Sequence, residues 1–408
     1  MKINSKTTII VLAAFFAAQA MADVVSNISC QQRWPWNGKV DINYTLSPSE
    51  ATTPVYSVKF YASIDGRECF ELKDVVGDGA CGIVLGSGAK RVTWDSNASG
   101  RAINTENMKI GVAAKEVTAS ATYLHYNIAN RKMDISATLP KVLESAAKTK
   151  ELWFRRVEPG TFEMGSPEEE TGHFDNNNNE VRHTVTITKA YYIGVYEMTQ
   201  GQFSNLFNEN PSQNGSVNPV STLPATNVSY AMMRGSFFGS SWPEHTDYMV
   251  DSDSYLGRLR EQARNSFTFD LPTEAQWEMA CRAGTDTAFN NGVAWEETGK
   301  GLTNTVLDTL GWYRGNGNSL HSVGLKLPNA LGLYDMHGGV WEWCIDRYAV
   351  DNTSFTLDPV GTAARTNYRV VRGGAFNEWA IRCRSSRRMG FSTTDRGGNR
   401  GVRLAIVK

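Results

Sequence analysis

Period-two alternation of hydrophobic and polar residues is the clearest pattern in the first third of the chain. In residues 40–46, Val, Ile, Tyr and Leu alternate with Asp, Asn and Thr, and similar runs cover 55–64 and 109–113. Such alternation is typical of strands that bury one face. Asn-Gly, Asp-Gly and Gly-Asp-Gly sequences between the runs provide turns. Short strands at this spacing predict an antiparallel β-sandwich of immunoglobulin or fibronectin type over residues 23–140.

The remainder of the chain has shorter and less regular patterns. After a linker at 141–151, the segment WFRRVEPGTFEMGS alternates on both sides of a Pro-Gly pair, which predicts a hairpin. Helical periodicity over 199–208 predicts one helix, with a threonine available as its cap. A second helix is predicted after Thr273, which forms a capping box with Gln276. The sequence therefore predicts an α+β domain over 152–408 with long irregular stretches.

The N-terminus has the pattern of a targeting segment. Lys2 and Lys6 precede an apolar run at 8–18, and Ala20-Met21-Ala22 supplies the small-x-small pattern that precedes a cleavage site, here ahead of Asp23. The run is too short to span a bilayer, and no later segment approaches about 20 apolar residues. We therefore expect a signal peptide at 1–22, no membrane span, and a periplasmic, cell-surface or secreted location.

Composition limits the classes of partner. The chain has 408 residues, of which 41% are hydrophobic and 20% charged, as in soluble globular proteins. Its formal net charge of -1 predicts no nucleic-acid partner, because polyanion binding needs a strong positive balance. A protein, a peptide or a small molecule remains possible as a ligand.

Six segments in the second part carry a family resemblance. In order they resemble the formylglycine-generating enzyme family, the sulfatase-modifying factors, and the resemblance implies a variant of the C-type lectin fold with little regular secondary structure. The segments are FEMGS (162–166), YYIGVYEMTQGQF (191–203), LPTEAQWEMACRAG (271–284), NALGLYDMHGGVWEWCID (329–346), VVRGGAF (370–376) and GVRLA (401–405).

The resemblance implies a structural calcium site. Its ligands fall on the Asp335 side chain, the carbonyls of Gly338 and Val340, and the Glu342 side chain. Calcium favours such cages of hard oxygens, and a loop bent by glycines can direct several carbonyls inward. Gly339 replaces the usual Asn of the motif. The alternative is that the two acidic residues pair with buried arginines instead.

The resemblance also bears on catalysis. The family's oxidases bind Cu(I) through two thiolates, and the first falls on Glu378, with Ala375 in place of a motif serine. The second thiolate is absent here, so copper is not expected. Glu378 remains the candidate catalytic acid or base. No histidine pair has metal-binding helical spacing, and His337 is expected at the surface of the calcium loop.

Six cysteines are distributed over the chain. The resemblance implies a disulfide between Cys281 and Cys383. Cys69 and Cys81 flank a Gly-rich turn and are candidates for a second, local bridge, which an exported chain would retain. The two remaining cysteines have no assigned partner.

The C-terminal segment is rich in arginine. Residues 365–403 hold ten arginines and two acidic residues, which allows an anion-binding interpretation. The resemblance instead implies framework roles for four of them, paired with buried carboxylates such as Glu274, Glu278, Glu342 and Asp346. These four are Arg372, Arg384, Arg387 and Arg403.

Three hypotheses about function follow. The first is an exported binding or accessory protein of the family without copper oxidase activity. The second is an active family enzyme that uses Glu378 and neighbouring non-cysteine residues, or a different cofactor, on a peptide or siderophore-like substrate. The third is a C-type-lectin-like protein with a diversified ligand-binding face, although the relevant segment offers only Asn377 and Asn399 as asparagines.

Overall fold

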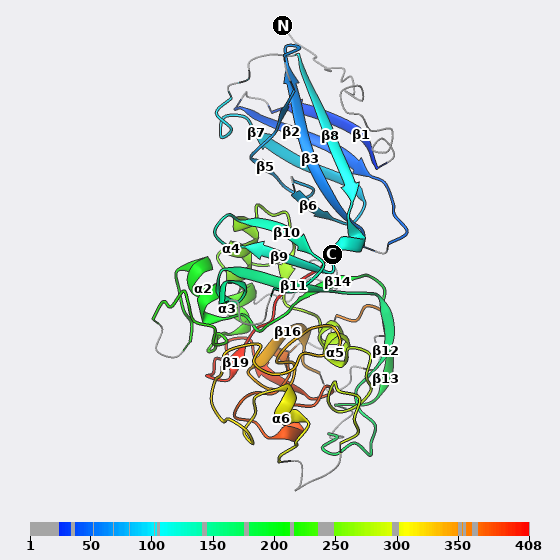
Figure 1. Ribbon diagram of the computed structural model, residues 1–408, viewed down its shortest axis with the longest axis vertical. Helices are drawn as coiled ribbons and strands as arrows, with labels where there is room; N and C mark the ends of the chain where they lie inside the picture. The colour runs from blue at the N-terminus through cyan, green and yellow to red at the C-terminus, as the bar shows by residue number, and fades with distance from the viewer. Residues whose placement is uncertain are drawn as a thin grey trace.

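A computed structural model has a smaller all-β unit at the N-terminus and a larger domain below it, with the C-terminus close to their junction (Figure 1). Strands predominate and the helices are few and short. The structure describes residues 24–33, 37–51, 53–67, 69–80, 82–101, 103, 107–140, 145–174, 179–212, 216–235, 249–295, 302–349, 353, 356–360 and 366–407.

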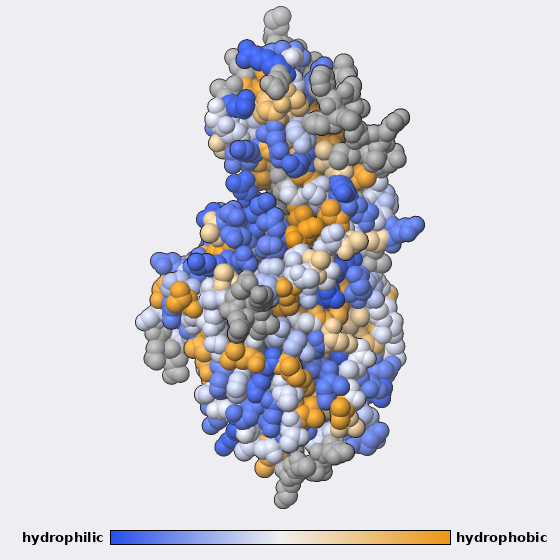
Figure 2. Space-filling view, in the orientation of Figure 1, coloured by the Kyte–Doolittle hydropathy of each residue, from blue (hydrophilic) through white to orange (hydrophobic). Residues whose placement is uncertain are grey.

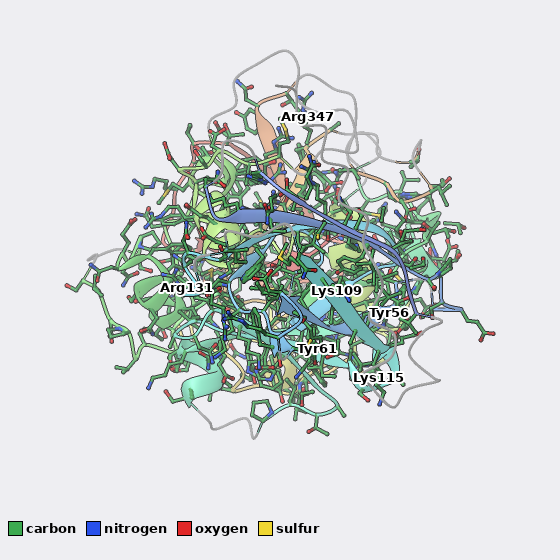
Figure 3. The ribbon with its side chains drawn as sticks, turned by 90° about the horizontal axis from the view of Figure 1, so that it is seen from above. Tyr56, Tyr61, Lys109, Lys115, Arg131 and Arg347 are labelled. Carbon is green, nitrogen blue, oxygen red and sulfur yellow. The ribbon has the colours of Figure 1, made fainter. Side chains whose placement is uncertain are left out.

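The first unit contains two sheets that contribute to one hydrophobic core. Ile42 and Trp94 come from one sheet, Phe60 and Ile110 from the other, and all four are fully buried. The first sheet has the order β1 (Val25–Gln32), β2 (Lys39–Leu46), β7 (Gly88–Asp95), β5 (Val75–Val76). The second has β4 (Phe70–Glu71), β3 (Val55–Ile64) and β6 (Gly82–Leu85), and β8 (Met108–Glu116) also pairs with β3. Figure 3 looks along the long axis from this end, with Tyr56 and Tyr61 on β3 and Lys109 and Lys115 on β8.

The next hairpin belongs to the second domain. After the short η1 turn (Thr118–Ser120), β9 (Tyr123–Asn127) and β10 (Lys132–Ser136) pair with each other, and β9 pairs with β11 (Glu151–Val157). The hairpin precedes residue 140, where the sequence predicted the end of the first unit. In space, however, it is part of a sheet of the second domain. Alternation predicts that a segment is a strand, but it does not identify the sheet that the strand joins.

A six-stranded sheet organises the second domain. Its order is β10-β9-β11-β14-β20-β15, with β14 at Tyr191–Gly194, β20 at Ala405–Ile406 and β15 at Phe269–Asp270. The last strand of the chain thus pairs with strands from the middle of the chain. This pairing brings the GVRLA and YYIGVYEMTQGQF segments together, although more than 200 residues separate some of their partners.

The strands predicted around Pro159 form, but they do not form a hairpin with each other. β11 pairs with β9 and β14, whereas β12 (Gly160–Met164) pairs with β13 (His183–Ile187). The predicted hairpin is therefore wrong, because the chain turns at Pro159-Gly160 and continues into a separate sheet. A further sheet has the order β18 (Arg388–Ser392), β17 (Tyr368–Arg372), β16 (Trp341–Arg347), β19 (Arg400–Gly401).

Two predicted helix starts are confirmed. Thr199 caps α2 (Gln200–Phe207) and Thr273 caps α5 (Glu274–Arg282), each with both hydrogen bonds of a capping box. The buried face of α5 carries Trp277 and Cys281 into the core of the domain. The other helices are α1 (Ser145–Thr149), α3 (Tyr230–Arg234), α4 (Tyr255–Gln262), α6 (Leu307–Leu310) and the turn η2 (Ala380–Arg382).

The two parts meet in a packed, hydrogen-bonded junction. Thr53 accepts a hydrogen bond from Arg156 Nη1 at 2.8 Å and donates one to the Ala190 carbonyl at 3.1 Å. Val55 and Leu85 of the first unit belong to the main core of the second domain. On the face seen in Figure 2, hydrophobic and hydrophilic residues are mixed, including at the narrowing between the two parts. Among the described residues, no helix is long and apolar enough to cross a bilayer.

Candidate functional site

The loop 373–379 follows β17 and rests on the turn at 338–340. Gly338 N donates to the Gly373 carbonyl and Phe376 N to the Gly339 carbonyl, both at 2.8 Å. Gly374 has a φ of +80°, and a Cβ added there would lie 2.6 Å from the Sγ of Cys383. This crowding and this backbone conformation explain why glycine occupies the position.

Glu378 lies half-buried at the end of this loop. Its Oε1 accepts a hydrogen bond from the indole Nε1 of Trp341 at 3.3 Å, and its backbone carbonyl accepts one from Arg314 N at 2.9 Å. The Arg314 guanidinium stacks over the Trp379 ring, with Cζ 4.3 Å from the ring centroid. The loop therefore places the half-buried Glu378 carboxylate against the buried indole of Trp341, next to the more exposed stack of Arg314 on Trp379.

Two amide side chains, those of Asn377 and Asn399, lie next to this group. Asn399 Nδ2 donates to Asn377 Oδ1 at 3.1 Å, and the Asn399 carbonyl accepts from Trp341 N at 2.9 Å. From the sequence, both asparagines were expected only as part of a sparse binding face, and no motif pointed to Trp341 as a partner of Glu378. Trp341 belongs to the WEW motif, so its position in the motif was visible although its contact was not.

His337 is fully buried, so its predicted surface position is wrong. Its Nε2 accepts from Asn290 N at 3.2 Å, and its Nδ1 donates to the Cys383 carbonyl at 2.8 Å. Burial lowers the pKa of this imidazole to about 4, which keeps the ring neutral at physiological pH. The sequence predicted an exposed loop at this position, whereas segments from other parts of the domain enclose the loop.

Cys281 and Cys383 lie near opposite sides of the His337 ring. The Cys281 Sγ is 3.7 Å from its Nε2, and the Cys383 carbonyl contacts its Nδ1. Both cysteines are fully buried free thiols in this structure, and burial raises the pKa of Cys281 to about 12. The disulfide between them stays a prediction. Cys69 is a free thiol, and Cys81 lies outside the described residues.

Three buried carboxylates gather beneath the turn at 338–340. The Glu342 carboxylate accepts hydrogen bonds from Arg403 Nη2 at 2.7 Å and from Trp277 Nε1 at 2.5 Å. Glu197 Oε1 accepts from Val340 N at 2.7 Å. Asp335 Oδ2 accepts from Gly324 N at 2.6 Å, but its buried Oδ1 has no partner among the described atoms.

The electrostatics of this cluster follow from burial. Burial raises the pKa of Asp335 to about 6, and Lys148 and Arg403 counteract part of that effect. Burial also raises the pKa of Glu197 well above its usual value, and the charges of Asp335 and Glu342 add to the increase. The cluster therefore favours either a bound proton or a bound cation. No local sequence pattern pointed to Glu197, because the Val340 amide that donates to it lies 143 residues away in the chain.

Comparisons with known proteins identify the family of this domain. Residues 140–408 match the sequence profile of the sulfatase-modifying factor enzyme 1-like domain. The chain belongs to the sulfatase-modifying factor family.

Several relatives illustrate the range of this family. The formylglycine-generating enzyme of Thermomonospora curvata is 35% identical over 115 residues, which are 26% of this chain and 38% of that enzyme. The match thus spans about two fifths of the length of that relative. The chaperone protein LppX of Paenibacillus barcinonensis is 28% identical over 243 residues, or 55% of this chain and 82% of LppX.

Solved structures include PvdO from Pseudomonas aeruginosa, which is 22% identical, with a TM-score of 0.48 over 66% of this chain and 97% of PvdO. Treponema denticola variable protein 1 is 27% identical, with a TM-score of 0.47 over 63% of this chain and 95% of that protein.

The residues of this sulfatase-modifying factor domain fit the implied calcium ion in part. Asp335 fits, because its free Oδ1 is an oxygen donor directed into a buried, negatively charged cluster. Glu342 fits less well, since Arg403 and Trp277 already occupy both of its oxygens. Among the described residues, no group of three or more His, Cys, Asp or Glu is arranged to hold a metal ion. The implied set differs from such groups, because backbone carbonyls supply half of it.

The framework role of the arginines is confirmed by buried ion pairs. Arg372 pairs with Glu278 and lies 3.7 Å from Glu274, and Arg403 pairs with Glu342 at 2.7 Å. The other two pair with a carboxylate that the sequence analysis had not named: Arg384 lies 2.7 Å and Arg387 3.2 Å from Glu180.

Proposed function

We propose that this chain is an exported binding or accessory protein of the sulfatase-modifying factor family that does not oxidise cysteine to formylglycine with copper. The observation that supports this most directly is the side chain at position 378. A carboxylate occupies the place of the first copper thiolate, and it is engaged with the indole of Trp341. Cu(I) is a soft ion that favours thiolates over carboxylates.

The nearest thiol does not replace the missing pair. Cys383 is fully buried, and burial raises its pKa above the usual range, so it stays protonated. A buried thiol of this kind is neither a good metal ligand nor a nucleophile. The relative from Paenibacillus barcinonensis has the name of a chaperone, which is consistent with an accessory role for a family member.

Mass spectrometry of a sulfatase-motif peptide tests this proposal. The purified chain is incubated with the cysteine-containing peptide, Cu(I), oxygen and a reductant, with the Thermomonospora curvata enzyme as a positive control. We expect the thiol to remain intact with this chain while the control converts it to an aldehyde. Conversion by this chain, above a reaction without protein, would refute the proposal.

A second candidate is an enzyme that uses Glu378 as an acid or base. Its support is the half-buried carboxylate beside an indole N–H, which is a plausible arrangement for proton transfer. Metal analysis of the purified chain tests the form of this candidate in which a different cofactor assists Glu378. Copper or iron near one atom per chain would favour that enzyme, and amounts near background would leave the metal-free acid–base enzyme beside the accessory protein.

We also propose calcium at Asp335, Gly338, Val340 and Glu342. Calcium would hold the turn in place and neutralise the buried carboxylates, so a chelator should lower the melting temperature. The matched variants are Asp335→Ala, which should abolish the effect of the chelator, and the exposed Glu168→Gln, which should retain it. Equal melting of the unmodified chain with and without chelator would exclude this site.

Export and the accessory role of the first unit belong to the same proposal. A signal peptide at 1–22 predicts a mature chain that begins at Asp23, and intact mass measures this. In the exported protein we expect a disulfide between Cys281 and Cys383, which peptide mapping without reductant detects. The two sheets that share one core support an immunoglobulin- or fibronectin-like sandwich as a spacer or partner-binding unit.

A further inference from the structure

A cavity of about 870 Å³ lies where the first unit meets the second domain. Its walls come from the η1 turn, β11, β12 and the end of α5. Binding sites for small organic molecules commonly have volumes of about 300–1,000 Å³. The loop that carries Glu378 contributes nothing to this lining, so the cavity is separate from the Glu378 site.

Four arginines line the cavity, and three of them have carboxylate partners. A paired guanidinium is already neutralised and satisfied, so it offers little to a ligand. The three ion pairs are Arg156–Glu158 at 2.6 Å, Arg182–Glu163 at 3.5 Å and Arg282–Glu278 at 2.7 Å.

Arg155 of β11 is different. Among the described residues, no carboxylate lies within ion-pair distance of its guanidinium, whose Cζ lies 5.2 Å from the Tyr123 ring centroid. Its Nε is buried without a hydrogen-bond partner. A buried donor without an acceptor is unfavourable. The Nε atom is too enclosed for a ligand to reach, but the Nη groups of the same guanidinium also have no acceptor among the described residues, and Arg155 lines the cavity. A ligand carboxylate could therefore pair with the two Nη groups, because its two oxygens match two parallel N–H groups of a guanidinium.

The rest of the lining limits what accompanies that carboxylate. Phe162, Met279 and Leu331 provide an apolar wall. The lining also includes acids with exposed side chains, Glu158 at 66% and Asp286 at 75% relative exposure. These acids repel polyanions, whereas a single negative charge can be paired with Arg155. The cavity thus favours one carboxylate on an apolar body.

We propose that this cavity binds a molecule with a single carboxylate attached to an apolar chain, and that Arg155 holds the carboxylate. The same chemistry occurs in a free aliphatic acid and at the C-terminus of an apolar peptide. Because Thr118 and Ala119 of the junction also line the cavity, the ligand would contact both parts of the protein.

Isothermal titration of the full chain tests this proposal with two acid probes and their uncharged matches. The acids are octanoate and N-acetyl-trileucine with a free C-terminus, and the matches are octanamide and N-acetyl-trileucine amide. We expect at least one acid to bind, its amide to bind at least tenfold more weakly, and Arg155→Gln to lose at least tenfold in affinity. Binding of octanoate alone identifies a free acid as the source, and binding of the peptide alone identifies a C-terminus.

Two variants serve as controls. Arg182→Gln removes a lining arginine that is already paired, so it should retain the affinity for the acid. Glu378→Ala should also retain it, so that the outcome of the aldehyde assay and the outcome here are independent. Because Arg155 lacks an ion pair, Arg155→Gln should melt within a few degrees of the unmodified chain. No binding of either acid, or equal binding by a folded Arg155→Gln, would overturn the proposal.

Discussion

The two parts of this chain are stabilised in different ways. The first unit buries an apolar core between regular strands, in which Ile42, Phe60 and Trp94 are fully enclosed. The second domain also has apolar cores, but every buried arginine among the described residues lies there. The difference follows from secondary structure, because strands satisfy their own backbone groups whereas irregular loops need other partners.

Arginine supplies many of those partners. The guanidinium of Arg403 donates to the Gly194 carbonyl at 2.9 Å and the Tyr334 carbonyl at 2.8 Å, in addition to its ion pair. Arg372 similarly donates to the carbonyl of Ser386 at 2.6 Å. A planar group with five N–H donors can connect a carboxylate and several loop carbonyls at once. In this domain the buried charges thus take over a task that sheets perform in the first unit.

Removal of a central carboxylate should have the largest effect. Glu278→Ala leaves Arg372 and Arg282 buried without their shared partner, and the loss of one member of a buried pair costs about 3–5 kcal/mol. We expect denaturant unfolding of the second domain to shift by this amount. Glu163→Ala, which removes a half-exposed partner of Arg182, should cost less than about 1 kcal/mol. Equal effects of the two substitutions would contradict the comparison.

A cavity in the first unit should have the next largest effect. Ile110 is fully buried between the sheets, and truncation to alanine at such sites costs about 2–5 kcal/mol. Ile110→Ala should therefore destabilise the first unit, as followed by hydrogen exchange of its strands. Its neighbour Lys109 points outward, so Lys109→Ala should change little. If Ile110→Ala reduced protection from hydrogen exchange only in the second domain, the first unit would have no independent core.

Acid sensitivity should distinguish the second domain through His337. Its pKa in the folded chain is about 4, below the ordinary 6.5, so the folded state resists protonation. The contribution of neutral His337 to the free energy of unfolding is fully present above pH 6.5. It is lost as the pH falls toward 4, by at most about 3 kcal/mol. Asp335, with a raised pKa, acts in the opposite direction, so the measurement is the difference between the unmodified chain and His337→Gln. That difference should favour the variant increasingly as the pH falls, and a constant difference would exclude this role.

The junction should give the smallest effect. Arg264 and Asp74 connect the two parts at 3.4 Å, with side chains 49% and 33% exposed. An ion pair of this exposure contributes about 0–1 kcal/mol. Arg264→Ala should leave both melting temperatures nearly unchanged, because Val55 and Leu85 still pack into the second domain. Separation of the two melting transitions in this variant would show that the pair has a larger role than its exposure indicates.

The regular part of the fold was predictable from the sequence. The alternating runs at 40–46 and 55–64 correspond to β2 and β3, and the cap at Thr199 and the capping box at Thr273 start helices as expected. These signals are local, because the period of a strand and the cap of a helix depend on neighbouring residues.

The candidate site was only partly predictable. Family motifs identified Glu378 and Asp335, but they did not reveal that Trp341 donates to Glu378 or that Glu197 joins the acidic cluster. They also gave no indication that His337 is buried. Each of these facts depends on which loops enclose which residues, and no local period records that arrangement.

The β9–β10 hairpin has a consequence for how this chain is divided. The family profile begins at residue 140, yet two strands before that point complete the sheet in which Leu152 pairs with Tyr126 and Phe154 with Leu124. A protease cut between the hairpin and β11, followed by loss of the N-terminal fragment, would leave β11 as a bare edge that invites self-association. Recombination that exchanged the first unit would likewise have to supply this hairpin. The structural unit is therefore longer than the segment that the sequence profile matches.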